Sequence, residues 1–122
     1  MKLFSMRTLL RLEEVGIFCF SIFLFSLTDF SWWWFPLLIL LPDIGMIGYL
    51  LNPKIGASIY NLFHHMGIAV VIYLAGYFAA ISLLELTGVI LLGHAALDRI
   101  FGFGLKYPDS FKHTHLGRIG TN

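Results

Sequence analysis

The chain has 122 residues, of which 58% are hydrophobic, 16% aromatic and only 12% charged. Ordinary soluble domains contain about 45–50% apolar and about 25% charged residues, so this composition argues against a water-soluble monomer and against a disordered chain. Eight Lys and Arg residues and seven Asp and Glu residues give a formal net charge of +1, which argues against nucleic-acid binding through phosphates. The single cysteine, Cys19, excludes an intramolecular disulfide framework and a zinc site built from cysteines.

Gaps between charged residues predict four transmembrane helices, because a helix needs about 20 mostly apolar residues to cross a bilayer core. The predicted helices cover 10–28, 32–51, 57–83 and 86–103, and a polar tail covers 104–122. Short connections favour antiparallel neighbours, so we expect one all-α membrane domain over 1–122, an up-down four-helix bundle. We expect the first helix to be retained rather than cleaved as a signal peptide, since Glu13 and Glu14 stand at its start and no small-x-small cleavage site follows.

All basic residues fall on one side of this predicted topology. They are Lys2, Arg7, Arg11, Lys54, Arg99, Lys106, Lys112 and Arg118. The connections on the opposite side carry Asp29 and Glu85. The positive-inside rule therefore predicts a multi-pass protein of the inner, cytoplasmic membrane with both termini in the cytoplasm.

Ionisable residues from three of the predicted helices lie at a similar depth. With a rise of about 1.5 Å per residue, Asp43, His64 and His94 each lie roughly 10 to 14 Å inside the cytoplasmic boundary. Asp98 follows His94 by one helical turn, so both project from one face. An ionisable group in hydrocarbon costs at least roughly 2.5 kcal/mol, so we expect these side chains to face inward and to form a polar layer.

Imidazole and carboxylate ligands together suit zinc, iron or manganese. We therefore interpret Asp43, His64, His94 and Asp98 as a non-haem metal site, either hydrolase-like or metal-handling. Glu13 and Glu14 enter from the same side on the first predicted helix and are candidate catalytic bases. Three further histidines are candidate additional ligands: His65, His113 and His115.

His64 and His65 are neighbours on the predicted third helix, and about 100° separates their side chains. Both cannot face the same point, and the sequence leaves open which of them faces inward. Tyr60 lies one turn before His64, and Asn61 lies one turn before His65. Either residue could orient the imidazole that follows it.

Other functions stay open on the same residues. One histidine from each of two antiparallel helices could hold haem and make the protein an electron carrier, although the carboxylates of Asp43 and Asp98 favour a non-haem ion. A small transporter or proton path would require a homo-oligomer, because four helices are few for a transport pathway. An accessory or assembly subunit would need a membrane-protein partner, and its polar layer would only hold helices together. In every case the chain contacts the lipid bilayer, and no nucleic acid is expected.

Several sequence stretches carry a resemblance to a known family. They are Leu41-Pro42-Asp43-Ile44-Gly45-Met46, Phe63-His64-His65, Gly93-His94-Ala95-Ala96-Leu97-Asp98-Arg99 and His113-Thr114-His115-Leu116-Gly117. From the first helix to the tail, the chain resembles the small prokaryotic membrane proteins catalogued as domain of unknown function 4260. The resemblance implies a four-helix membrane protein and carries no established activity. A looser similarity, through Pro42-Asp43 and Thr114-His115, links it to inner-membrane metal-dependent hydrolases, although no second Asp and His follow Asp43 in that segment.

Overall fold

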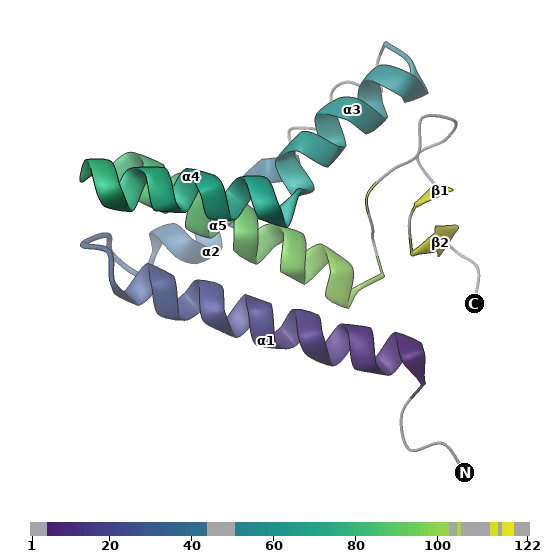
Figure 1. Ribbon diagram of the computed structural model, residues 1–122, viewed down its shortest axis with the longest axis horizontal. Helices are drawn as coiled ribbons and strands as arrows, with labels where there is room; N and C mark the ends of the chain where they lie inside the picture. The colour runs from purple at the N-terminus through teal and green to yellow at the C-terminus, as the bar shows by residue number, and fades with distance from the viewer. Residues whose placement is uncertain (1–4, 44–50, 103–104, 106–112, 115, 119–122) are drawn as a thin grey trace.

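The computed structural model describes residues 5–43, 51–102, 105, 113–114 and 116–118. Over these residues the chain is all-α, with five helices and one antiparallel pair of two-residue strands (Figure 1). The helices are α1 (Met6–Ser26), α2 (Trp34–Leu38), α3 (Pro53–His64), α4 (Met66–Ala79) and α5 (Ser82–Ile100). The strands are β1 (His113–Thr114) and β2 (Gly117–Arg118).

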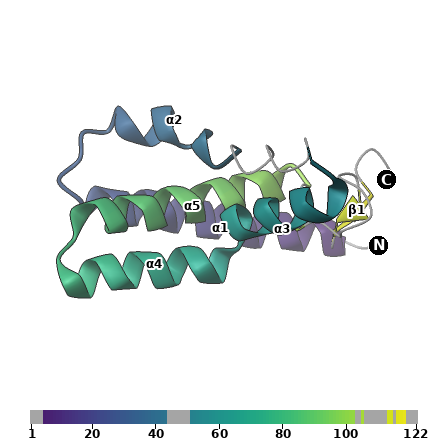
Figure 2. The ribbon, with the colours of Figure 1, turned by 90° about the horizontal axis from the view of Figure 1, so that it is seen from above.

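Helix α5 lies at the centre of the molecule. Figure 2 shows α2 on one side of α5 and α4 on the other, while α1 runs alongside in Figure 1. The hydrophobic core takes side chains from α1, α2, α4 and α5. Its buried members are Leu24, Phe25, Phe35, Ala69, Leu86, Val89, Ile90 and Leu92. Phe25 of α1 meets Phe35 of α2 edge to face, with ring centroids 5.3 Å apart, so aromatic packing joins these two helices.

Helices α4 and α5 are antiparallel and approach each other closely. Helix α4 ends at Ala80, which has a left-handed backbone (φ 57°), and the Ile81 N–H then donates to the Gly76 carbonyl at 2.8 Å. A Cβ on Gly88 of α5 would lie 2.5 Å from the backbone nitrogen of Tyr73 on α4. The two helix backbones therefore pack at a separation that only glycine permits at this position.

The prediction of one continuous helix over 57–83 is wrong. Helix α3 ends at His64, α4 begins at Met66, and the two helices are bent by 47°. Between them His65 has an extended backbone, and its Nδ1 accepts a hydrogen bond from the Ile68 N–H at 3.1 Å. This side chain satisfies an unpaired N–H group in the first turn of α4. Gly67 leaves room for the His65 ring, because a Cβ there would lie 2.9 Å from its Cε1.

The other predicted helix boundaries also differ from the structure. Predicted helices 10–28 and 86–103 correspond to α1 and α5, which begin four residues earlier and end two or three residues earlier. Predicted helix 32–51 is wrong over its described part, where α2 is followed by a turn and a 3-10 segment at 41–43. Pro42 has no N–H to donate to a preceding carbonyl, which opposes continued α-helix there. Residues 44–50 and most of the predicted tail 104–122 lie outside the described residues.

The described helices do not by themselves establish a membrane span. None of them alone combines the length and apolarity that a crossing requires, whereas α3 and α4 meet both requirements together as a bent pair. The part of the chain that the structure describes contains five helices where four were predicted, and insertion in a bilayer stays a prediction. Large apolar side chains are exposed on several helices, and on α4 Val71 and Phe78 are 65% and 80% exposed.

Candidate metal centre

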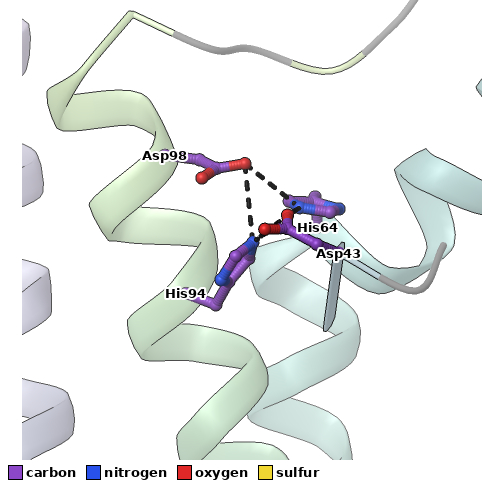
Figure 3. Close-up of side chains that lie close together, drawn as sticks. All are labelled: Asp43, His64, His94 and Asp98. Atoms are coloured by element: carbon purple, nitrogen blue, oxygen red, sulfur yellow. Dashed lines mark hydrogen bonds and ion pairs between the residues drawn. The ribbon is translucent and has the colours of Figure 1, made fainter. Parts of the chain in front are cut away.

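Four ionisable side chains meet where α3, α5 and the segment after α2 converge (Figure 3). They are Asp43, His64, His94 and Asp98, and one potential ligand atom from each lies within 4.8 Å of the others. We call them the His/Asp cluster. His94 and Asp98 lie one turn apart on α5, whereas His64 is the last residue of α3. The structure thus brings together the four residues that the sequence placed in one layer.

The distances in the His/Asp cluster suit a single small cation. The Nε2 atoms of His64 and His94 lie 2.9 Å apart. The Nε2 of His94 lies 2.9 Å from Asp43 Oδ1 and 3.6 Å from Asp98 Oδ2. The Nε2 of His64 lies 3.1 Å from Asp98 Oδ2 and 3.6 Å from Asp43 Oδ1. Tetrahedral zinc with bonds of about 2.0–2.1 Å has ligand atoms about 3.3–3.4 Å apart, within the range of these separations.

Hydrogen bonds at the other ring nitrogen fix the tautomer of both imidazoles. His64 Nδ1–H donates to the Tyr60 carbonyl at 2.8 Å, and His94 Nδ1–H donates to the Ile39 carbonyl. Each Nδ1 carries the proton, because a carbonyl oxygen can only accept. In the neutral rings both Nε2 lone pairs therefore point into the cluster, which is the form in which histidine binds a metal.

The cluster gathers four electron-pair donors around one point. The two Nε2 atoms lie 2.9 Å apart, so at most one of them can hold a proton between them. Each Nε2 also lies within hydrogen-bond distance of a carboxylate oxygen, 2.9 Å between His94 and Asp43 and 3.1 Å between His64 and Asp98. A divalent cation bonded to all four atoms would neutralise the carboxylates and replace repulsion between lone pairs by attraction.

Burial differs among the four side chains. The exposed fraction is 3% for the His64 side chain and 1% for that of His94, but 18% for Asp98 and 45% for Asp43. Buried charges are normally paired or bound to a metal, since desolvation is costly. The cluster is therefore closed on the histidine side and reachable from outside at Asp43.

Tyr60 supports two members of the cluster. Its ring stacks on the His64 imidazole, with centroids 3.8 Å apart and planes at 6°, and its carbonyl accepts the His64 Nδ1 proton. Its hydroxyl donates to Asp98 Oδ2 at 2.9 Å. The orienting role that the one-turn spacing before His64 suggested is thus present in the geometry, together with a second contact that spacing alone did not predict.

Replacing Tyr60 by phenylalanine is expected to weaken zinc binding by about 10–100-fold, the usual cost of removing a hydrogen bond that orients a metal ligand. The substitution keeps the stacked ring and the backbone carbonyl, so His64 stays in place and only Asp98 loses a contact. Zinc titration against a chromophoric chelator would measure the change. An affinity equal to that of the wild-type protein would contradict a role for the hydroxyl.

The two candidate bases lie outside the cluster. Glu14 is buried between α1 and α5, where its Oε1 lies 3.8 Å from Arg99 Nη1, whereas Glu13 is exposed. Neither carboxylate belongs to the group of potential ligand atoms formed by the described residues. Their assignment as catalytic bases stays a prediction.

The candidate additional ligands have different positions. His65 caps α4 and lies outside the described cluster, which answers the question of which neighbouring histidine faces inward. His113 begins β1, and His115 lies outside the described residues. Sequence reasoning missed the cap and also the Ile39 carbonyl that orients His94, because a backbone acceptor leaves no signature in side-chain spacing.

Comparisons with known proteins identify the family of this chain and give no activity. No curated protein and no solved structure matches the chain. The sequence model of the family described as "Domain of unknown function (DUF4260)" matches residues 7–119, a range that contains all four cluster residues. The chain therefore belongs to this family, as the resemblance of its motifs indicated.

Proposed function

We propose that this protein holds one divalent first-row metal ion, zinc in the first place, between Asp43, His64, His94 and Asp98. The observation that carries the proposal is the convergence of the two Nε2 atoms, which lie 2.9 Å from each other and 2.9–3.6 Å from one oxygen of each carboxylate. Zinc takes nitrogen and oxygen ligands in a tetrahedral arrangement. Iron and manganese accept the same donor set.

The reaction class that this site suits best is hydrolysis. A bound ion of this kind supplies Lewis acidity and a nucleophilic water at neutral pH. His64 and His94, held through Nδ1 by backbone carbonyls, would keep fixed positions. Asp43 is the most exposed of the four side chains at 45%, so its side offers the approach for water and substrate. Displacement of this carboxylate would open a coordination position for water. Alternatively, expansion from four to five ligands would let water bind beside the carboxylate.

We further propose that the protein is a multi-pass protein of the inner membrane with both termini in the cytoplasm. The apolar composition and the exposed apolar side chains of the helices support this assignment. The start of α1 and the end of α5 lie at one end of the molecule (Figure 1), which agrees with placing Arg7 and Arg99 on one side. Asp29 and Glu85 belong to the opposite end, near the start of α5.

A pair of identical substitutions at neighbouring positions tests the metal site. His64→Asn removes a ligand from the cluster, whereas His65→Asn removes an imidazole outside it and substitutes a residue that caps helices well. Elemental analysis of detergent-purified protein loaded with zinc and then dialysed should find about one ion per chain in the wild type and in His65→Asn. It should find almost none in His64→Asn. Equal zinc content in the two variants would refute the proposal.

A further inference from the structure

An apolar groove of about 350 Å³ lies between α2, α3 and α5. Its walls include Leu38, Pro42, Phe63, Leu86, Ile90 and Leu91. Thr87 also lines the groove, but its hydroxyl donates to the Leu83 carbonyl at 2.7 Å. The groove therefore offers hydrocarbon surface to an occupant and little to bind a polar group.

One face of α5 runs from this groove into the His/Asp cluster. Leu86 and Ile90 line the groove, His94 and Asp98 belong to the cluster, and the four residues follow one another at intervals of one turn. Leu86 is 6% exposed and Ile90 5%, so this part of the face is almost as well buried as the two histidines of the cluster. Ile90 precedes His94 by about 6 Å along the helix axis.

The two other segments that supply cluster residues also line the groove. Pro42 lines the groove and directly precedes Asp43, and Phe63 lines it and directly precedes His64. All three segments that supply cluster residues thus also supply the wall of the groove next to them. None of the four cluster residues lines the groove itself, but a residue one position or one turn away from three of them does.

We propose that the groove binds the hydrocarbon chain of a single-chain amphiphile whose oxygen-bearing head group reaches the metal ion. This inference rests on the proposed metal site and names its substrate class as an acyl lipid. The volume of the groove lies in the range of small-ligand pockets, about 300–1,000 Å³. A stable protein–protein interface instead buries about 1,000 Å² or more of surface, so we take a small molecule as the occupant. Leu41 and Leu83 on the groove wall are 57% and 67% exposed, so a chain can enter from the side.

Alkyl hydroxamates of different length test the inference, because the hydroxamate group binds metal ions and the tail is variable. Cobalt-loaded protein in detergent would be titrated with acetohydroxamic acid and with dodecanohydroxamic acid, and the visible absorption of the cobalt ion would report head-group binding. Thr87→Trp and Leu91→Trp place an indole in the groove. Val71→Trp, at a 65% exposed position of α4 that does not line the groove, is the matched control. Partitioning of the long chain into micelles is the same for every variant.

The preference for the long chain over the short one should fall by about tenfold or more in both groove variants, since each buried methylene contributes to binding. Affinity for acetohydroxamic acid and cobalt content should not change, and Val71→Trp should behave as the wild type. An unchanged preference in the groove variants would overturn the inference and leave bulk lipid or a second copy of the chain as the occupant. Failure of the wild-type protein to bind cobalt would overturn the proposed function, and this inference with it.

Discussion

Asp98→Asn is expected to abolish the stabilisation of the protein by zinc while leaving the fold intact. Asparagine has the size of aspartate, and its carbonyl oxygen can still accept the hydrogen bond from Tyr60. The anionic oxygen that lies 3.1 Å from His64 Nε2 and 3.6 Å from His94 Nε2 is lost. At a zinc concentration 100 times the dissociation constant, the wild type should gain about 2.7 kcal/mol, and the variant should gain almost nothing.

Thermal unfolding in detergent, with and without zinc, measures this difference. Asp29→Asn is the matched control, because Asp29 lies in the connection after α1 and outside the cluster. The control should keep the full zinc-dependent rise of the melting temperature. Without zinc, Asp98→Asn should be somewhat less stable than the wild type, because the interactions of the Asp98 carboxylate with the His64 and His94 imidazoles are weakened. An equal rise with zinc in Asp98→Asn would show that the ion is held elsewhere.

Gly88→Ala is expected to destabilise the protein by about 1–3 kcal/mol, the usual cost of overpacking. In a helix interior, replacing glycine by alanine ordinarily stabilises a protein by about 1 kcal/mol. The expected change in the free energy of unfolding therefore has the opposite sign to the usual one. The reason is the backbone of α4: the new Cβ would lie 2.5 Å from the nitrogen and 2.7 Å from the Cα of Tyr73. Backbone atoms cannot rotate away as a side chain can, so α4 and α5 would have to separate.

Gly16→Ala provides the comparison for Gly88→Ala. Gly16 lies within α1, and a Cβ built there meets no atom within 4 Å. This substitution should therefore stabilise the protein by up to about 1 kcal/mol. The midpoint of thermal unfolding should fall in one variant and rise in the other. A Gly88→Ala protein as stable as Gly16→Ala would mean that the two helices are not in backbone contact.

The composition of the His/Asp cluster could be predicted because helical geometry is regular. The fixed rise per residue placed Asp43, His64 and His94 at one depth, and the fixed rotation placed Asp98 on the same face as His94. These arguments hold for His64, His94 and Asp98, which lie on α3 and α5, and the break after His64 does not disturb them. The depth of Asp43 was derived from predicted helix 32–51, which is wrong over its described part, so its place in the cluster agrees with the prediction without that helix.

The bend itself could not be predicted. Hydropathy continues through residues 57–83, and no proline stands at the break, although Gly67 follows His65 in the first turn of α4. A histidine is seldom a helix cap, so the identity of His65 alone did not distinguish it from a second ligand. The early end of α2 could not be predicted either, because the apolar stretch over 32–51 is compatible with a long helix. Only the position of Pro42 pointed to an earlier end of regular α-helix.

Helix α3 packs on the rest of the protein mainly through the residues of the His/Asp cluster and Tyr60. Ala57 and Tyr60 of α3 are buried, but no described residue of α3 belongs to the apolar cluster formed by α1, α2, α4 and α5, and two of the four buried residues of α3 are Tyr60 and His64. Binding of the proposed ion and the docking of α3 on α5 would then be thermodynamically linked, and the linkage would work in both directions. A partner that pulled α3 away would release the ion, and an ion that bound would resist that partner with the same free energy.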